Sequence, residues 1–558
     1  MSQSPLSEWT DDVRVRIRDV QRTLRRTAEV LRGSSIDVEE YDPAEHGPLV
    51  SFSGHVGYEE VERYWVNAPF AFVSVNYDDV ENEYRYHVVE PELDDLEADL
   101  LERLFADVRD SLIHRRGAGD GDGGSGDGVQ SDDPEAVLKA ELRELLTMYG
   151  VDLDPASFFR LFYYLDRSFR GFGKLDPLMH DPHIEDISCD GYDLPLFVYH
   201  DEYTDIETNV AYAEEELDNL VVRLAQQSGR HVSIGEPVVE TTLPDGSRAE
   251  LALGEEVTPR GSAFTIRKYA DEPFTPVDLV NYGTFSLDQM AYLWLAIENN
   301  KSLIFAGGTA SGKTTSMNAI SMFVPPRSKV LTIEDTRELA LYHDNWLSSV
   351  TRERRGESAD ITMYDLLRSA LRHRPEYIVV GEVRGEEAMT LFQAMNTGHT
   401  TYSTMHADSV QTVINRLENE PINVPRAMIQ SLDILSVQRL TYVGEERVRR
   451  NNVIAEIEGI DQRTGDLDYS TTFSWRADDD SFRQNDSSIV DEIQDEKGWS
   501  RSELLEEIRD RKRVLQYLRE RGVTDYRRFT AMINEYYSHP ERVLDTIDLE
   551  NEVVTGFD

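Results

Sequence analysis

The chain has 558 residues, 40% of them hydrophobic and 9% aromatic, so it is long enough for three to four domains and too apolar for an intrinsically disordered protein. Its 106 acidic and 57 basic residues leave a net charge of -49, which opposes binding to nucleic acid or anionic membrane unless basic side chains are concentrated locally. It has no apolar run near the ~18 residues that span a bilayer and no signal-peptide layout, so we expect a cytoplasmic location with at most peripheral membrane contact.

The first predicted element is a helix over Asp12–Arg32, in which apolar residues follow a heptad-like spacing and arginines surround the apolar seam. One interpretation is a helix that packs on its own domain, with its arginines paired to nearby carboxylates. The other is a docking helix for an acidic partner or a lipid surface.

Strand-like alternation at Phe70–Tyr77 and Tyr84–Val89 and a helix over Asp95–Ile113 follow. Residues 117–134 are rich in glycine and aspartate and indicate a flexible linker, because they offer nothing to pack. We therefore expect residues 1–116 to form a small N-terminal accessory or docking domain.

Beyond this linker the pattern predicts a helix over Glu135–Tyr149 and then a mixture of helices and short strands, among them Leu196–Tyr199 and Phe264–Arg267. The Asp-Gly pair within Leu243–Arg248 predicts a hairpin turn. A single cysteine, Cys189, excludes a disulfide or a thiolate metal site within one chain, and we expect it to be a small buried residue.

Residues 285–440 alternate short apolar runs with helical patterns, which predicts a doubly wound, mainly parallel α/β sheet. From about residue 485 onward the pattern is helical. These patterns give expected domains at 135–275, 276–440 and 441–558, the last made of strands and helices.

The strongest motif is Gly307–Thr314 (GGTASGKT), which fits G-x-x-x-x-G-K-[ST] in full. An apolar run, Ser302–Ala306, precedes it and a helical stretch, Thr314–Phe323, follows it, so backbone N–H groups and a helix N-terminus would face a bound phosphate. Lys313 would reach the β- and γ-phosphates, and the Thr314 hydroxyl would bind Mg²⁺. The expected nucleotide-binding residues are Gly307, Gly308, Thr309, Ala310, Ser311, Gly312, Lys313, Thr314 and Thr315.

Two further apolar runs end in carboxylates. Val330–Asp335 (VLTIED) ends in two adjacent acids, and Tyr377–Glu382 (YIVVGE) ends in Glu382, with Gly381 where a Walker B strand usually carries aspartate. At the carboxyl ends of parallel strands such acids border the ligand crevice, where they can activate water or hold Mg²⁺. Without the glycine-rich motif, a solvated acidic turn would be the better interpretation.

A fourth segment, Thr397–His406 (TGHTTYSTMH), has a histidine on each side of a β-prone stretch. His406 is thereby expected at the end of a strand, near the γ-phosphate crevice. A lone histidine is usually structural. Because these histidines follow the preceding motifs, a structural role and a functional role are about equally favoured.

Walker A, an acidic box (TIEDTREL), a Walker B without aspartate (YIVVGEVRGEEA) and a histidine box (TGHTTYSTMHADS) occur in this order over about residues 300–410. This set resembles the superfamily of type II/IV secretion, type IV pilus and archaellum ATPases, whose own Walker B form lacks the aspartate. A looser likeness covers about residues 150–440 and includes DPHIEDISCDG, LPDGSR and FTIRK. The single cysteine departs from bacterial members with a four-cysteine zinc subdomain. Together with an acidic composition similar to that of extreme halophiles, this indicates an archaeal, haloarchaeal member.

The resemblance implies a PAS-like α+β lobe before a RecA-like core, six subunits in a ring, and ATP with Mg²⁺ bound between the lobes. It implies Glu334 as the water-activating base, Glu382 as support for Mg²⁺ and water, and His406 as a sensor of the γ-phosphate. Arg248 and Arg267 match family positions whose guanidinium groups reach the phosphates, and a surface ion pair is the alternative for each. The Mg²⁺ ligands expected, partly through water, are Thr314, Asp335 and Glu382.

The resulting hypothesis is a mechanoenzyme that hydrolyses ATP and transmits lobe motion to a polytopic membrane platform protein, which extrudes pilin-like subunits. The segment Glu62–Leu93 is more similar to pilus and secretion members than to the archaellum motor. One alternative is a RecA-like nucleic-acid translocase, which would need a basic or aromatic channel that residues 285–440 do not suggest; no nucleic-acid partner is expected. The other is a nucleotide-gated scaffold, against which Lys313, Glu334 and Glu382 argue.

Overall fold

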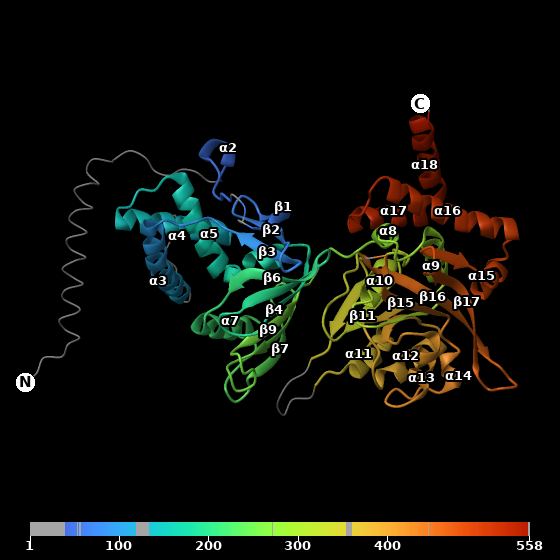
Figure 1. Ribbon diagram of the computed structural model, residues 1–558. Helices are drawn as coiled ribbons and strands as arrows, with labels where there is room; N and C mark the ends of the chain where they lie inside the picture. Colours follow the sequence, from blue (N-terminus) through green and yellow to red (C-terminus); the bar gives the residue numbers. More distant parts are fainter. Residues whose placement is uncertain are drawn as a thin grey trace, which may run out of the picture. The chain divides into compact units, whose positions relative to one another are not determined.

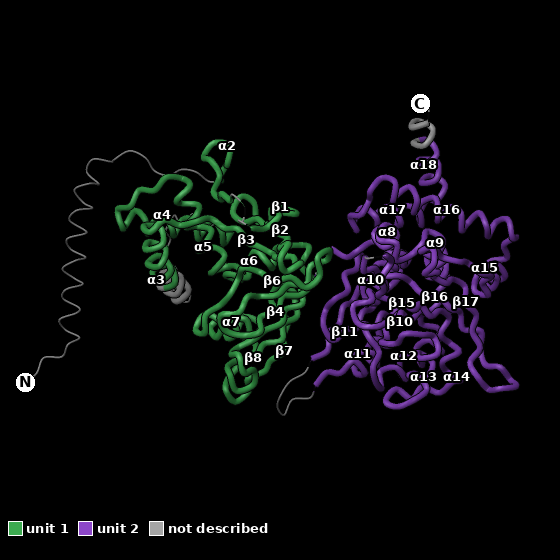
Figure 2. The backbone as a smooth tube through the Cα atoms, viewed as in Figure 1, with its two compact units in different colours: residues 1–268 green, residues 269–558 purple. Residues whose placement is uncertain are grey.

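The computed structural model describes residues 40–52, 54, 57–118, 133–269, 272–352, 360–444 and 446–555. The chain forms two compact units, residues 1–268 and 269–558 (Figures 1 and 2). The helix expected over Asp12–Arg32 and most of the expected linker lie outside the described residues. Within the described parts, none of the helices combines the length and the apolar character needed to cross a membrane.

The first unit is built on a nine-stranded sheet in the order β1-β2-β3-β6-β5-β4-β9-β8-β7. All neighbours are antiparallel except β3 and β6, which pair in parallel. In sheet order the strands are β1 (Glu59–Asn67), β2 (Ala71–Asp78), β3 (Glu83–Val89), β6 (Thr204–Ala211), β5 (Pro195–His200), β4 (Ile184–Cys189), β9 (Ala263–Arg267), β8 (Arg248–Ala252) and β7 (Val238–Thr242). The β3·β6 pair places strands from before and after the Gly/Asp-rich segment in one sheet, which the sequence patterns did not predict.

The ends of α4 (Pro134–Tyr149) carry the residues that local chemistry predicts. Asp133 caps α4 through its side chain, a proline occupies the first helical position, and Gly150 ends the helix in the left-handed conformation. The hairpin expected at the Asp-Gly turn is confirmed by the β7·β8 pair, and Cys189 is buried as expected. The helices are α2 (Pro43–His46), α3 (Asp95–Ala118), α4 (Pro134–Tyr149), α5 (Pro155–Phe169), the 3₁₀ helix η1 (Gly173–Leu175), α6 (Asp176–His180) and α7 (Glu214–Gln227).

The second unit contains another nine-stranded sheet, in the order β12-β11-β13-β14-β10-β15-β16-β17-β18. The first six strands are parallel and the last three extend the sheet in antiparallel pairs. Their bounds, in sheet order, are β12 (Trp346–Val350), β11 (Val330–Glu334), β13 (Tyr377–Val380), β14 (Thr400–His406), β10 (Leu303–Gly307), β15 (Ile434–Val443), β16 (Glu446–Ile460), β17 (Leu467–Arg476) and β18 (Ser481–Gln484). The parallel part confirms the RecA-like α/β core.

Helices cover both faces of this sheet (Figure 1). Along β10, Leu303 and Phe305 belong to one apolar core and Ile304 and Ala306 to the other, because successive side chains of a strand point to opposite faces. The first core contains α8 (Pro276–Asn281), α9 (Leu287–Glu298), α10 (Lys313–Ser321), α15 (Ser488–Lys497), α16 (Arg501–Glu520), α17 (Tyr526–Ser538) and α18 (Pro540–Thr555). The second contains α11 (Met363–Ala370), α12 (Glu387–Asn396), α13 (Val410–Glu418) and α14 (Arg426–Ile429), and the 3₁₀ helix η2 (Leu371–His373) follows α11.

Candidate active site

Four neighbouring parallel strands of the second unit bring the predicted motifs to one edge of the sheet. In sheet order, β11 ends at Glu334, Gly381 follows β13, β14 ends at His406 and β10 ends at Gly307. His406 lies directly opposite Gly307 in the register of β14 and β10. Segments up to 99 positions apart in the chain (307 to 406) therefore meet at the carboxyl ends of the strands, where open α/β sheets bind their ligands.

The glycine-rich motif forms a tight loop between β10 and α10. A Cβ at Gly307 would collide with the Ser311 side chain, and Gly312 has φ +85° at the N-cap of α10, a conformation that glycine adopts without strain. Inside the loop the Lys313 ammonium donates to the Gly308 carbonyl at 2.8 Å. The loop is thus shaped by the residues that a phosphate cradle needs.

The other residues of the motif occupy the loop crest and the first helical turn. Thr309 and Ala310 are exposed, and Ala310 has a positive φ of 56°. Thr314 and Thr315 are half-buried in the first turn of α10. Thr314 is therefore placed on the helix N-terminus, where a hydroxyl can meet a metal ion next to phosphate.

Lys313 is a buried cation, with 8% of the residue exposed. Burial lowers its pKa, and the carboxylates of Glu382 and Glu338 oppose that shift. Among the described residues this ammonium, which has three donors, donates to the Gly308 carbonyl, so donors remain for an anion.

Glu334 is the most strongly perturbed carboxyl at this edge. It is 2% exposed, and burial raises its pKa to about 7 although its Oε1 accepts from the backbone N–H groups of Glu338 and Leu339, each at 2.9 Å. Its Oε2 is buried and has no hydrogen-bond partner among the described residues. A carboxylate with a pKa near neutrality and one unused oxygen is suited to take a proton from water.

The packing of Gly381 explains why the acid after β13 is Glu382, one position beyond the usual Walker B aspartate. A Cβ at this position would lie 3.3 Å from Cγ of Glu334, closer than side-chain carbons normally pack. Glycine therefore leaves the space that Glu334 fills, and the aspartate of a usual Walker B strand would compete for it.

We expect Gly381→Ala to lower kcat for ATP hydrolysis by about 10²-fold, because displacing a reacting group by ~1 Å has an effect of that size. The matched control is Gly385→Ala, whose added methyl group would meet the end of the Glu387 side chain at 3.2 Å, a contact that a flexible side chain can relieve. Steady-state phosphate release measures both variants, and circular dichroism verifies that both are folded. Equal rates in Gly381→Ala and the wild type would show that Glu334 does not need this space.

Glu382, Arg384 and His406 form a polar group beside the loop. Arg384 donates to Oε2 of Glu382 at 2.6 Å. Nε2 of His406 lies 3.2 Å from Oε1 of Glu382, yet that oxygen has no well-aligned hydrogen bond among the described residues. Burial and the charge of Lys313 lower the pKa of His406, which keeps the imidazole neutral at neutral pH. The contact between His406 and Glu382 is therefore a contact between a neutral ring and a carboxylate, not an ion pair. The three side chains line a cavity of about 660 Å³, whose other lining residues come from α13 and the segment after it.

The remaining predicted residues are less enclosed. Asp335 is exposed at the end of β11 and its Oδ1 accepts from the Thr351 hydroxyl at 3.1 Å. Arg248 and Arg267 are register partners on β8 and β9 of the first unit. Arg248 pairs with Glu240 and Arg267 with Asp186, the latter at 3.0 Å. Their action on a nucleotide stays a prediction.

Two residues at this edge carried no motif signal. Arg449, on β16, donates to the Ala310 carbonyl at 3.0 Å and so supports the crest of the loop. Gln438, opposite Gly307 on β15, donates to the Ser316 hydroxyl, and its Oε1 is buried without a partner among the described residues. Both lie more than 100 residues beyond the loop, on strands that only the folded sheet brings to it.

The residues present fit a magnesium–triphosphate. Three buried oxygens near the loop lack hydrogen-bond partners in the described part of the chain, on Glu334, Glu382 and Gln438. Buried polar atoms are normally paired, so such a group indicates a ligand or ordered water that completes it. Lys313 and the loop N–H groups would hold phosphate, and Thr314 with Glu382 would face Mg²⁺.

Family models and curated relatives show which proteins this chain is similar to. A family model described as type II/IV secretion system protein matches residues 202–496, and models described as PilB3-like, N-terminal and PilB3-like, C-terminal match residues 18–92 and 478–557. The uncharacterised protein MJ0900 of Methanocaldococcus jannaschii is 38% identical over 393 residues, which cover 69% of this chain and 71% of that protein. The type IV secretion system protein PtlH of Bordetella pertussis is 31% identical over 260 residues, covering 40% of this chain and 76% of PtlH.

Among solved structures, the VirB11 ATPase of the Brucella suis type IV secretion system is 24% identical, with a TM-score of 0.26 over 50% of this chain and 94% of that one. The pilus retraction motor PilT with bound ADP is 21% identical, with a TM-score of 0.36 over 56% of this chain and 83% of that one. Scores this low carry no functional argument.

Proposed function

The chain belongs to the type II/IV secretion system protein family, and from this premise we propose that it is a P-loop ATPase that powers a pilus or secretion machine. The observation that carries the proposal is the meeting of a lysine-bearing glycine loop with Glu334, Glu382 and His406 at the carboxyl ends of four adjacent strands. Family membership and this geometry both support the proposal, because the acids of the motif set lie at the same edge of the sheet as the glycine-rich loop.

Each side chain has a definite task in this proposal. Lys313 and the loop amides bind the phosphates, and bound Mg²⁺ would neutralise charge that develops on them. Glu334 takes the proton of the attacking water through its unused Oε2. Glu382, held by Arg384, would help to hold Mg²⁺ and its water, and neutral His406 would serve as a hydrogen-bonding group for the terminal phosphate. The action of Arg248 and Arg267 on the phosphates belongs to the same proposal, in which Asp335 would add an outer acid to the metal site.

We propose further that the chain works as a hexamer at the cytoplasmic face of the membrane, against a polytopic platform protein. The PilB3-like matches at both ends of the chain support a pilus or secretion machine over an archaellum motor. The PAS-like interpretation of residues 135–275 belongs to the same proposal.

The test is phosphate release by the purified chain with Mg²⁺ and ATP. The proposal expects turnover that increases with its platform protein or lipid vesicles. Stimulation by single-stranded DNA alone would favour a nucleic-acid translocase. Turnover equal to that of Glu334→Gln, and negligible in both, would favour a nucleotide-gated scaffold.

The pH dependence of hydrolysis follows from Glu334. Because the pKa of its carboxyl is about 7 and a general base must be ionised, kcat/KM should rise with pH along a limb centred near pH 7. The folded-state pKa lies above that of the unfolded chain, so ionising Glu334 also lowers folding stability as pH rises from about 4 through 7. Initial rates from pH 5.5 to 9 at fixed salt measure the limb. A flat profile down to pH 5.5 would exclude Glu334 as the base with this pKa.

A further inference from the structure

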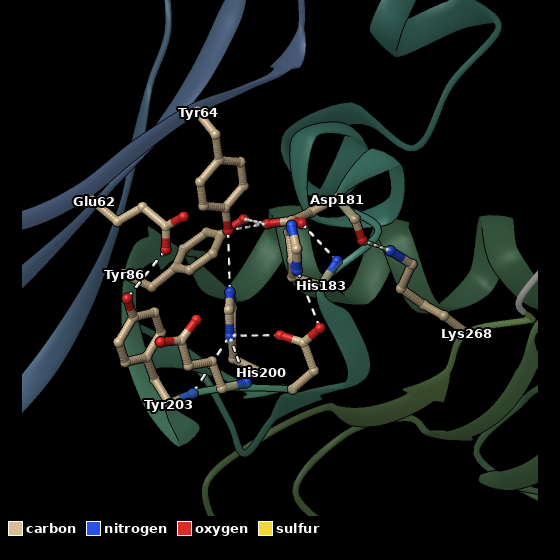
Figure 3. A network of polar contacts seen from close by, with 10 residues as sticks. Glu62, Tyr64, Tyr86, Asp181, His183, His200, Tyr203 and Lys268 are labelled. Carbon is tan, nitrogen blue, oxygen red and sulfur yellow. Dashed lines mark hydrogen bonds and ion pairs between the residues drawn. The ribbon is translucent and has the colours of Figure 1, made fainter. Parts of the chain in front are cut away.

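A second cluster of ligand-type side chains lies in the first unit (Figure 3). His183 precedes β4, His200 ends β5, and Asp201 begins the turn into β6. One potential ligand atom from each of the three lies within 4.8 Å of the other two. The Asp201 backbone N–H donates to the His183 carbonyl at 2.9 Å, which holds these two residues side by side.

The protonation of His200 is determined by a chain of hydrogen bonds behind it. Tyr64 donates to Oδ2 of the fully buried Asp181 at 2.8 Å, and Tyr86 donates to the same oxygen at 2.5 Å. Because the Tyr64 hydroxyl spends its proton on Asp181, it must accept from Nε2 of His200 at 3.2 Å. The Nε2 atom therefore carries the hydrogen, and Nδ1 presents a lone pair.

Nδ1 of His200 lies beside Asp201, which also contacts His183. Nδ1 of His200 lies 3.1 Å from Oδ1 of Asp201, and Oδ2 of Asp201 lies 3.1 Å from Nδ1 of His183. The backbone N–H groups of Glu202 and Tyr203 also donate to Nδ1 of His200, at 3.1 and 3.4 Å. A lone pair and a carboxylate oxygen in contact repel each other, and a cation between them removes the repulsion.

We propose that His183, His200 and Asp201 form a binding site for a divalent transition-metal ion of the zinc class, with both imidazoles coordinating through Nδ1. The two spacings of 3.1 Å end on different oxygens of Asp201, and each is close to the ~3.4 Å that bonds of ~2.1 Å subtend at a tetrahedral ion. Two imidazoles with one carboxylate select such an ion over Mg²⁺ or Ca²⁺, which prefer oxygen ligands. When the ion binds, it replaces the backbone N–H groups of Glu202 and Tyr203 as the partner of the lone pair on Nδ1 of His200.

The surroundings fit this role. His200 is 1% exposed, whereas the side chains of His183 and Asp201 are 45% and 44% exposed, so an ion has access from solvent and a fourth position stays open for water. The Nε2–H of His200, anchored through Tyr64 on Asp181, is the outer-shell hydrogen bond that orients metal-binding histidines. Carboxylates of Glu62 and Asp181 add negative potential at His183.

The site would join segments from distant parts of the chain. Tyr64 and Tyr86 lie on β1 and β3, while the three ligands flank β4 and β5. Metal binding would therefore stabilise the attachment of the N-terminal strands to the rest of the nine-stranded sheet, and the midpoint of thermal unfolding would rise with metal concentration.

The experiment uses the full, tag-free chain after chelation and without nucleotide. Zn²⁺ binding is measured by calorimetry, and Co²⁺ is added as a spectroscopic probe of its ligands. We expect about one Zn²⁺ per chain, resistant to excess Mg²⁺, and a visible Co²⁺ absorption band. His183→Asn and Asp201→Asn, which change half-exposed side chains, should abolish both signals, and Tyr64→Phe should weaken Zn²⁺ binding by about 10-fold or more.

Two controls separate ligation from general charge. Glu202→Gln removes an exposed carboxylate next to Asp201, and His180→Gln removes a nearby histidine whose Nδ1 bonds the Asp176 carbonyl at 2.8 Å. Both should bind Zn²⁺ as the wild type does. Wild-type chain that retains no Zn²⁺, or an unchanged Co²⁺ band in His183→Asn and Asp201→Asn, would overturn the proposal. Because these readouts need no ATP turnover, they are independent of the proposed function.

Discussion

Replacing Glu334 with glutamine should lower kcat for ATP hydrolysis by 10²–10⁴-fold and leave nucleotide affinity nearly unchanged. Glutamine keeps the size of the side chain and can still accept from the backbone N–H groups of Glu338 and Leu339, but it cannot take a proton from water. The loss should therefore appear in kcat. Single-turnover phosphate release and the affinity for a fluorescent ATP analogue separate the two quantities.

The matched control is Glu338→Gln, which removes a neighbouring exposed carboxylate. The backbone N–H of this residue, which donates to Glu334, is kept. This variant should retain hydrolysis within a few-fold of the wild type. A decrease of less than 10-fold in Glu334→Gln would transfer the role of general base to Glu382, and Glu382→Gln would then show the larger loss.

Lys313→Ala should weaken ATP binding and lower kcat by about 10²–10³-fold, because it removes a buried cation aimed at the phosphates. In the folded chain this ammonium is partly desolvated and donates to the Gly308 carbonyl, so it is held in the loop before any ligand arrives. The defect should appear in both affinity and turnover, which distinguishes it from that of Glu334→Gln.

Lys512→Ala is the matched control for this variant, since Lys512 lies on α16 and pairs with Asp288 at 2.6 Å at a half-exposed position. Isothermal calorimetry with ADP and phosphate release with ATP measure both variants. ADP binding of Lys313→Ala equal to that of the wild type would contradict the role of the loop as a phosphate cradle.

Much of the fold follows from local patterns. The strand of β10, the glycines after it and the helix α10 are adjacent in sequence, and each was predicted from its own residues. The alternation of apolar runs and helical patterns predicted the parallel sheet correctly, because buried parallel strands read as continuous apolar runs. The helical tail was also predicted, but its packing into the same core as α9 was not.

Some features of the candidate site were likewise predicted from the sequence, and others appear only in the fold. Glu334, Glu382 and His406 were chosen from strand ends, and the sheet places them side by side as parallel strands require. Their chemical roles stay predictions. The support of the loop by Arg449 and the packing of Gly381 against Glu334 had no signal in the sequence, because each depends on a contact between strands distant in the chain.

The sequence by itself determined the glycine-rich loop, since a strand, its glycines and the following lysine lie within one short stretch whose geometry is local. Only the tertiary structure decided which protonation states the site favours and which side chains share it. Burial that raises the pKa of Glu334 comes from neighbours on other strands, and the cluster of His183, His200 and Asp201 is oriented by Tyr64 from β1. Desolvation and long-range hydrogen bonds are properties of the packed chain, so no local pattern of residues encodes them.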